Sequence, residues 1–249
     1  MKTKLAVLIS GGGRTLLNLQ KCINNGTLDA TIALVISSRH NAKGVKRSKD
    51  LGLPTKVISK SFLSPEDFQQ GVTAAIVDAN VDLVCMAGFL SLWKIPERWQ
   101  NRVLNIHPAL LPDFGGRGMY GNAVHKAVLD AKRLVSGCTV HYCNNEYDSG
   151  PIILQRTVDV MPDDTPDSLA ERVFAEECIA YPEAIRKVMA KNRITWEYMV
   201  IDEHKHGSPD NEFELNELGK EGWELTCSRG DSTGNRTWYF KRRISTILS

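Results

Sequence analysis

An asparagine and a histidine stand two residues apart in the stretch RVLNIHPALLP, residues 102–112. Side chains of a strand alternate between its two faces, so Asn105 and His107 share one face, while the neighbouring leucine and isoleucine take the other. Pro108 ends such a strand, which places an amide and an imidazole together at its carboxyl end. This pair can stabilise a developing oxyanion, although a lone strand histidine is more often structural.

Three consecutive glycines, Gly11, Gly12 and Gly13, followed by Arg14 and Thr15, separate an apolar run from a helical pattern. Glycines let the backbone approach a ligand closely, and the first N–H groups of a helix attract phosphate. The stretch lacks the lysine of a Walker loop, and leucine replaces the last glycine of a GxGxxG motif. A ligand-free glycine turn explains the pattern equally well.

Three further stretches place polar or flexible residues where α/β proteins build sites. Gly88, in MAGFLSLW, follows an apolar run, and ligands of open α/β sheets bind at the carboxyl ends of strands. Asp148 precedes a Gly-Pro pair and takes part in chemistry only if it reaches His107; an ordinary turn is the simpler interpretation. Glu176 and Glu177 point about 100° apart on a predicted helix, so at most one faces a site. From the residues alone, both are interpreted as solvated charges.

Composition excludes several classes of function. The 249 residues include 31 lysines and arginines against 29 acidic residues, a net charge of +2, so no global field favours nucleic acid or a membrane surface. No apolar run approaches the roughly 20 residues of a membrane helix, and Leu5–Ile9 is too short for a secretory signal core. We expect a cytoplasmic protein. The 6 cysteines show no metal-binding spacing, so we expect reduced thiols and no metal.

Apolar runs of strand length alternate with helical patterns through most of the chain. The predicted strands are Leu5–Ile9, Thr31–Ile36, Val81–Met86, Val103–Ile106, Thr139–Cys143 and Ile152–Val158. The predicted helices are Leu16–Asn24, Ala42–Leu51, Pro65–Asp78 and Pro166–Lys191, the last capped by Thr165. This alternation predicts an α/β fold with a mainly parallel sheet covered on both faces. A hairpin-like pattern around NNEYDSGP makes the sheet mixed.

The C-terminal segment has a different character. Its stretches ITWEYMVI, GWELTCS and RTWYFKRR are aromatic-rich and strand-like, and they surround one charged helical pattern, NEFELNELGKEG. Trp196, Trp223 and Trp238 fall here and are expected to form a compact core. We therefore predict two domains, residues 1–192 and a small α+β domain at residues 193–249.

Six stretches, taken in order, resemble the phosphoribosylglycinamide formyltransferase family of purine biosynthesis, from about Lys4 to Lys191. They are SGGGRTLLNL, DLVCMAGFLSLW, LNIHPALLP, FGGRGMYGNAVHKAVL, SGCTVHYCNNEYDSGPIILQ and RVFAEECIAYP. The resemblance implies a Rossmann-like formyltransferase fold. It also implies transfer of a formyl group from 10-formyltetrahydrofolate to the amine of glycinamide ribonucleotide, without a metal.

The resemblance implies roles for individual residues. The family's catalytic asparagine, histidine and aspartate fall on Asn105, His107 and Asp148. The residues implied for the ribonucleotide are Gly11, Gly12, Gly13, Arg14 and Thr15 of the phosphate loop, Gly88, and Glu177, whose carboxylate matches the one that holds the ribose hydroxyls. The residues implied for the folate are Leu90, Ser91, Leu92, Trp93 and Cys143, together with Asn105 and Asp148.

Alternatives stay open beside this family. Methionyl-tRNA formyltransferase shares the asparagine-isoleucine-histidine core but adds a basic C-terminal barrel, whereas the tail here is short and the net charge is near zero. Formyltetrahydrofolate hydrolase carries an extra N-terminal domain, whereas we expect this chain to begin at its first strand. A non-catalytic sensor of a phosphorylated metabolite is the alternative from another class, and the presence of all three catalytic residues speaks against it.

The sequence departs from the family pattern in two loops. Many members have asparagine or serine where this chain has Gly12, Arg14 and Thr15; backbone N–H contacts are expected to survive there, and Arg14 to add charge. Some members use an arginine where this chain has Pro65, so contacts from that loop are not carried over. The C-terminal segment resembles a small family of unknown function through WEY, ELNELGKEGWEL and YFKR. That resemblance gives no activity, and the hypothesis is a packing or assembly role, by self-association or through an unknown partner.

Overall fold

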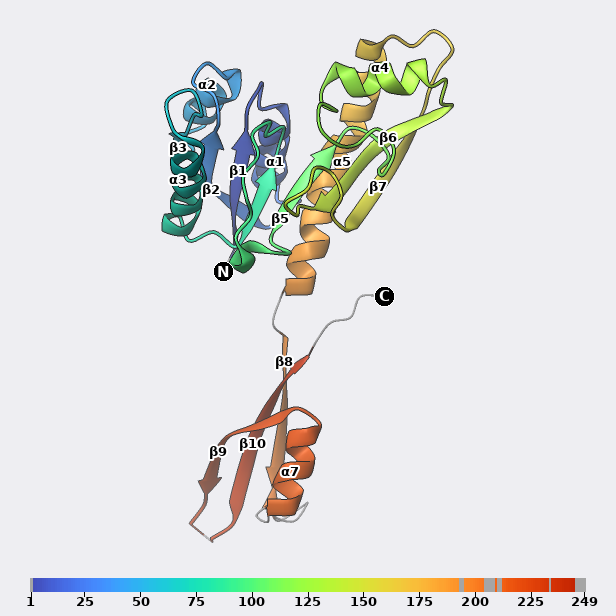
Figure 1. Ribbon diagram of the computed structural model, residues 1–249. Coiled ribbons are helices and arrows are strands. Elements are labelled where there is room, and N and C mark those ends of the chain that lie inside the picture. The colour runs from blue at the N-terminus through green and yellow to red at the C-terminus, as the bar shows by residue number, and fades with distance from the viewer. Residues whose placement is uncertain (1, 193–194, 204–208, 210–211, 233, 245–249) are drawn as a thin grey trace. The chain divides into compact units, whose positions relative to one another are not determined.

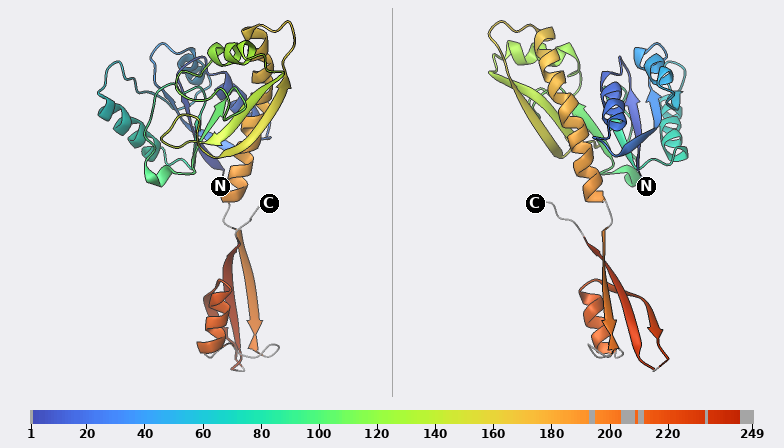
Figure 2. Two further views of the ribbon diagram at one scale, coloured as in Figure 1. Left: turned by 45° about the vertical axis from the view of Figure 1, so that its right-hand side comes forward. Right: turned by 180° about the vertical axis from the view of Figure 1, so that it is seen from behind.

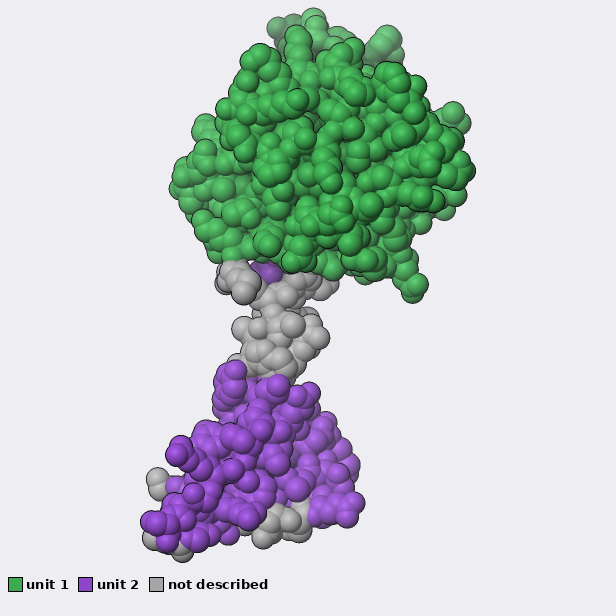
Figure 3. Space-filling model, turned by 90° about the vertical axis from the view of Figure 1, so that its left-hand side faces the viewer, with its two compact units in different colours: residues 1–186 green, residues 187–249 purple. Residues whose placement is uncertain are grey.

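The computed structural model describes residues 2–192, 195–203, 209, 212–232 and 234–244 (Figure 1). The chain forms two compact units, residues 1–186 and 187–249 (Figure 3). Helix α5, Pro166–Asn192, ends where the sequence predicts the first domain to end, and residues 193–194 lie outside the described part. In the described part, no helix is long and apolar enough to cross a membrane.

The first unit is built on a seven-stranded sheet in the order β3-β2-β1-β4-β5-β6-β7. The strands are β1 (Thr3–Ile9), β2 (Ala30–Ser37), β3 (Thr55–Val57), β4 (Leu83–Met86), β5 (Val103–His107), β6 (Val135–Tyr142) and β7 (Ile152–Asp159). The first five in this order are mutually parallel, whereas β6 and β7 are antiparallel to their neighbours. The predicted mixed sheet is therefore confirmed.

Helices cover both faces of this sheet (Figure 1, Figure 2). They are α1 (Arg14–Asn24), α2 (Lys43–Asp50), α3 (Pro65–Asp78), the short 3-10 helix η1 (Glu97–Trp99), α4 (Asn122–Asp130) and α5. Leu8 of β1 packs in one core cluster with Phe68 and Ile76 of α3. Val7 and Ile9, which alternate with Leu8, are also fully buried and face the opposite side. An apolar run buried on both faces is what the parallel sheet requires.

Helix α5 is fixed to the two strands that carry the candidate site. Tyr181 is fully buried, and its hydroxyl lies 2.9 Å from the carbonyl oxygen of Met86 and 3.0 Å from that of Leu104. Thr165 Oγ1 accepts the N–H of Ser168 at 3.2 Å, which confirms the predicted cap. Through Tyr181, α5 is therefore tied to both β4 and β5.

The sequence pattern does not predict two short elements, nor the first residues of one strand. The edge strand β3 pairs with Val35–Ser37 but contains only one apolar residue. Helix α4 follows Gly121 without a capping side chain, so the usual signal of a helix start is missing. Strand β6 starts at Val135 rather than Thr139, because its first residues include a serine and a glycine that interrupt the apolar run.

The second unit has a three-stranded antiparallel sheet in the order β8-β10-β9 and one helix. Its elements are β8 (Thr195–Asp202), α7 (Glu212–Lys220), β9 (Trp223–Gly230) and β10 (Arg236–Ile244). Trp238 and Phe240 are buried, which confirms the predicted core position of Trp238. Trp223 is only half-buried, with the guanidinium of Arg242 lying 4.5 Å above its ring, and the side chain of Trp196 lies outside the described residues.

Candidate active site

Asn105 and His107 lie at the carboxyl end of β5. This strand pairs with β4 on one side and β6 on the other, so Asn105 lies between Met86 and His141. His107 is only 3% exposed, and Asn105 is half-buried. Both line one cavity of about 700 Å³, called here the main cavity. The predicted shared face of the two side chains is therefore confirmed.

The loop between β6 and β7 brings Asp148 against this pair. Its Oδ2 lies 3.5 Å from Nδ1 of His107, and its Oδ1 lies 3.4 Å from Nδ2 of Asn105. Asp148 has a φ of 51°, a left-handed conformation that costs energy in a non-glycine residue. A Cβ at Gly150 would lie 1.8 Å from the carbonyl oxygen of Tyr142, so this close turn requires glycine. The turn thus delivers the carboxylate to the imidazole.

Hydrogen bonding fixes the tautomer of His107. Nε2 lies 2.8 Å from the carbonyl oxygen of Phe114, so in the neutral ring Nε2 carries the proton and Nδ1 presents its lone pair to Asp148. Burial lowers the pKa of His107, while Asp148 and the Phe114 carbonyl raise it in part. A protonated ring would donate to both the carboxylate and the carbonyl. The site can therefore accept a proton on His107 when negative charge develops nearby.

His141 completes this cluster and was not predicted. It is 2% exposed, and its Nδ1 donates to the carbonyl oxygen of Tyr142 at 2.9 Å. Its Nε2 is therefore free of a proton in the neutral ring and accepts from Nδ2 of Asn105 at 3.2 Å. A signal existed in the sequence: Thr139 and His141 are polar residues of the predicted strand Thr139–Cys143, with the same two-residue spacing as Asn105 and His107 on β5.

The charge state of Asp148 follows from its contacts. Burial raises the pKa of its carboxyl, but the contacts with His141 and His107 and the N–H of Gly116 at 3.0 Å outweigh burial. The overall effect lowers the pKa, so the carboxylate is ionised at neutral pH. An ionised Asp148 beside His107 attracts a proton placed on that imidazole.

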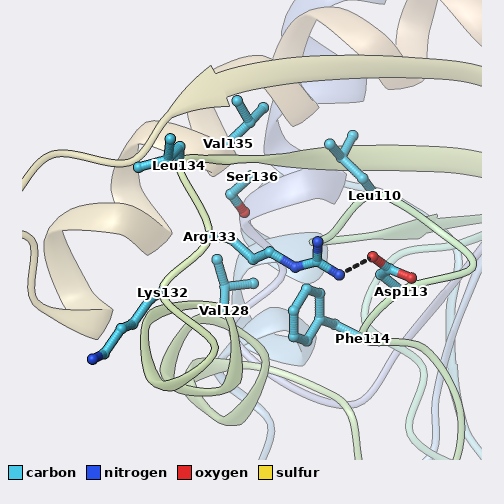
Figure 4. Close-up of a pocket in the computed structure, with 9 residues that line it drawn as sticks. All are labelled: Leu110, Asp113, Phe114, Val128, Lys132, Arg133, Leu134, Val135 and Ser136. Carbon is cyan, nitrogen blue, oxygen red and sulfur yellow. Dashed lines mark hydrogen bonds and ion pairs between the residues drawn. The ribbon is translucent and has the colours of Figure 1, made fainter.

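Phe114 links His107 to a second, smaller cavity of about 480 Å³ (Figure 4). Phe114 has a φ of 56°, which is strained for a bulky residue. The guanidinium of Arg133 lies 5.7 Å from the centre of its ring and pairs with Asp113 at 2.6 Å. Figure 4 shows Arg133 pointing toward Asp113, with the Phe114 ring next to its guanidinium. This group holds the segment whose carbonyl accepts from His107.

The glycine loop forms another part of the main cavity wall. Gly13 has a φ of 73°, and a Cβ there would lie 2.9 Å from Cα of Gly44, so this close approach requires glycine. Nη1 of Arg47 donates to the carbonyl oxygen of Gly12 at 2.7 Å. Helix α1 starts at Arg14 without a side-chain cap, so no capping side chain occupies its first N–H groups. The loop is thus held by contacts with Gly44 and Arg47, and the first backbone N–H groups of α1 have no side-chain cap.

Arg14 is engaged by helix α5. Its two terminal nitrogens donate to the two carboxylate oxygens of Glu171, each at 2.6 Å, and its guanidinium lies 3.8 Å from the centre of the Phe174 ring. Arg14 still lines the main cavity. Glu171 nevertheless offsets the charge that the sequence predicted Arg14 would add to the loop.

The adjacent glutamates of α5 take different roles. Glu177 lines the main cavity, and burial raises its pKa to about 7, with Arg14 lowering it in part. Glu176 is partly buried and pairs with Arg156 of β7. The interpretation of both as solvated charges is wrong. The side of α5 that carries these two glutamates faces the rest of the first unit, where Glu176 meets Arg156 and Glu177 meets the main cavity. The expectation that at most one faces the site is confirmed.

The main cavity gathers most, but not all, of the predicted residues. Those that line it are Gly11, Arg14, Thr15, Gly88, Leu90, Asn105, His107, Asp148 and Glu177. Those that do not are Gly12, Gly13, Ser91, Leu92, Trp93 and Cys143. Trp93 is 1% exposed and donates its indole N–H to Thr73, while Leu92 accepts from Gln69. Cys143 Sγ lies 3.8 Å from the sulfur of Met86.

Sequence reasoning missed several lining residues. They include Arg39, Met119, Tyr120, His125 and Tyr147. Arg39 could have been found, because it follows the carboxyl end of a predicted strand. The structure pairs none of the six cysteines, all within its described part. Across the described residues, no group of three or more His, Cys, Asp or Glu side chains is placed to hold a metal ion.

Known proteins resemble this chain over its first unit and beyond. The formyl transferase family matches residues 3–185. The chloroplastic phosphoribosylglycinamide formyltransferase of Arabidopsis thaliana is 38% identical over 202 residues, which cover 78% of this chain and 68% of that protein. The trifunctional purine biosynthetic protein adenosine-3 of Gallus gallus is 40% identical over 190 residues, which cover 75% of this chain and 18% of that protein.

Solved structures give the same answer for the fold. The crystal structure of glycinamide ribonucleotide transformylase 1 from Symbiobacterium toebii superposes with a TM-score of 0.71 at 35% identity, covering 78% of this chain and 91% of that one. The phosphoribosylglycinamide formyltransferase of Coxiella burnetii, in complex with CHES, gives a TM-score of 0.70 at 34% identity, covering 77% and 89%. The chain therefore belongs to the phosphoribosylglycinamide formyltransferase family of formyl transferases.

Proposed function

We propose that this chain transfers a formyl group from 10-formyltetrahydrofolate to the amine of glycinamide ribonucleotide in purine biosynthesis. The observation that carries the proposal is the cluster of Asn105, His107 and Asp148 in one cavity of a chain from this family. The chain spans less than a fifth of the trifunctional relative, so the other activities of that protein are not part of the proposal.

The amine attacks the formyl carbon, which forms a new C–N bond and leaves an oxyanion on a tetrahedral carbon. Asn105 donates an N–H to that oxygen; the amide N–H nearest Asp148, at 3.4 Å, is weakly held and can be redirected. His107 acts through its charge, because both of its ring nitrogens already face protein acceptors. In the proposal, His107 takes up one proton from solvent before the attack and returns it after the transfer. In this protonated state the imidazole stabilises the oxyanion without a direct hydrogen bond.

Asp148 orients the imidazole of His107 and balances its positive charge. In the proposal, this ionised carboxylate also takes the proton from the attacking amine, through a water molecule. The C–N10 bond of the folate then breaks, and N10 regains a proton, so the transfer consumes no proton overall. His141 holds Asn105 in place by accepting one of its amide N–H groups at 3.2 Å.

Substrate contacts are assigned along the cavity wall. The glycine loop at residues 11–15 and Gly88 receive the ribonucleotide, and Glu177 accepts from the ribose hydroxyls. On the folate side, the N–H of Leu90 already donates to Ser10 Oγ at 2.8 Å. We therefore assign the wall of the folate pocket to the Leu90 side chain rather than to backbone donors of residues 90–93. Of the residues implied for the folate, Ser91, Leu92, Trp93 and Cys143 do not line the main cavity.

An absorbance assay tests the proposal. Purified full-length protein is mixed with 10-formyl folate, with and without glycinamide ribonucleotide, and release of the deformylated folate is followed. The proposal predicts release only when the ribonucleotide is present. Release without the ribonucleotide would identify a hydrolase, and tight ligand binding without release would identify a sensor; either result would overturn the proposal.

A further inference from the structure

We propose that Arg39, rather than Arg14, supplies the cationic side chain that recognises the phosphate of the ribonucleotide. The inference rests on the proposed function, because it concerns how that substrate is bound. Arg39 follows β2 and lies outside the glycine loop. The inference therefore adds a residue that determines specificity for the phosphate.

The register of the sheet places Arg39 beside the glycine loop. Strands β1 and β2 are parallel neighbours, with Ile9 opposite Ser37. The next residues are tied together, because the hydroxyls of Ser10 and Ser38 lie 2.5 Å apart and the N–H of Ser38 donates to the carbonyl oxygen of Ile9 at 3.1 Å. Arg39 follows immediately, and it lines the main cavity together with residues of the loop.

The backbone of Arg39 is fixed while its guanidinium is available. Ser37 Oγ accepts the N–H of Arg39 at 3.3 Å and donates to its carbonyl oxygen at 2.8 Å. Arg39 is exposed, and within the described residues its guanidinium makes no hydrogen bond or ion pair. By contrast, Arg47 donates to Gly12 and Arg14 to Glu171. Of these three arginines, Arg39 is the one whose donors are uncommitted.

Charge balance gives the second argument. Helix α5 presents Glu171, which pairs with Arg14, and Glu177, which lines the main cavity. A phosphate placed at the loop adds negative charge, which neutral backbone N–H groups alone do not compensate. A guanidinium offers a planar set of donors that fits a phosphate, and its charge is permanent. Arg39 follows the end of β2 and forms no ion pair with either of these carboxylates among the described residues.

The test compares substrates with and without the phosphate. Steady-state kinetics of wild type, Arg39→Ala and Arg39→Lys are measured with glycinamide ribonucleotide and with the phosphate-free glycinamide riboside. We expect Arg39→Ala to raise KM for the ribonucleotide by about 10- to 100-fold, the usual size of a charge-assisted contact, with kcat nearly unchanged. KM for the riboside should not change, and Arg39→Lys should recover part of the loss. Arg14→Ala is the matched control and should raise KM for the ribonucleotide less than Arg39→Ala does.

A binding experiment separates this inference from the proposed function. Calorimetric affinities for ribose 5-phosphate and for ribose are measured with the same proteins. Loss of ribose 5-phosphate affinity in Arg39→Ala supports the inference even if the wild type transfers no formyl group. Unchanged affinity in Arg39→Ala, equal loss for both riboside and ribonucleotide, or a larger loss in Arg14→Ala would overturn it, whether or not the wild type is active.

Discussion

The β5 end of the main cavity and its glycine-loop end hold polar groups in different ways. At the β5 end, Asn105, His107, His141 and Asp148 contact one another, and both histidines are almost fully buried. At the glycine-loop end, Gly11 and Gly88 line the wall, and Arg39 is exposed. The buried network holds its side chains in one orientation, which the chemical step needs. The exposed arginine at the other end supplies positive charge, which phosphate binding needs. The two ends should therefore respond differently to substitution.

The largest effect is expected at the closed end. Replacing Asp148 with Asn removes the charge that faces His107 while keeping the shape of the side chain. We expect kcat to fall by about 10²- to 10³-fold, the scale of losing one group that stabilises the transition state, with KM for the ribonucleotide nearly unchanged. Steady-state kinetics measure both constants. A raised KM at unchanged kcat would place Asp148 among the binding residues instead.

A smaller loss is expected from the group that supports His107 from behind. Arg133→Ala removes the ion pair to Asp113 and the contact over Phe114 (Figure 4), so the strained Phe114 carbonyl can move away from His107. We expect kcat to fall roughly tenfold, below the ~10²-fold that a misplacement of 1 Å can cost. Lys126→Ala, which removes an exposed ion pair within α4, is the matched control and should leave kcat unchanged. Equal kcat values for the two variants would contradict the proposed effect of Arg133 on His107 through Phe114.

The open end should show a pH-dependent effect on binding. Burial raises the pKa of Glu177 to about 7. Above that pH the carboxylate is ionised and accepts from the ribose hydroxyls; below it the group is protonated and accepts less well. KM for the ribonucleotide should therefore rise as pH falls from about 8 to about 6, following the protonated fraction of one carboxyl group. Glu177→Gln should flatten this dependence, and an equally steep profile in that variant would assign the titration to another group.

The smallest effect on the chemistry is expected from the second unit. Removing residues 193–249 leaves α5 complete and removes none of the residues that line the main cavity. We expect kcat and KM to stay within about twofold, because units of this kind have their own cores. A packing or assembly role predicts a change in the number of chains per particle, obtained by light scattering as the particle mass divided by the mass of one chain. An unchanged number of chains together with unchanged activity would count against that role.

The sequence predicts the fold well where local signals agree with the long-range structure. Helix α3 is predicted to the residue, because Ser64 caps it through the N–H of Asp67 and Pro65 stands at its first turn. Helix α4 lacks such a cap and was missed. Strand β6 was only partly recognised, because a serine and a glycine interrupt the apolar run in its first half.

The same distinction between local and long-range signals holds for the residues of the site. The spacing of Asn105 and His107 predicts their shared face, because strand geometry is local. The contact of Asp148 with His107 depends on a loop with positive φ, and spacing alone could not show it. His141 reaches Asn105 through cross-strand register, and Arg39 reaches the loop through the order of strands. Neither of these two placements can be predicted from a single stretch of sequence.

The most direct test of the account is the rate of ribonucleotide-dependent deformylation of 10-formyl folate by His107→Ala beside the wild type, at saturating substrates. The account predicts that the wild type releases folate only with the ribonucleotide, and that the variant is slower by at least about 10²-fold while its KM stays close to the wild-type value. A variant that keeps most of the wild-type rate would contradict the central claim that chemistry occurs at the carboxyl end of β5.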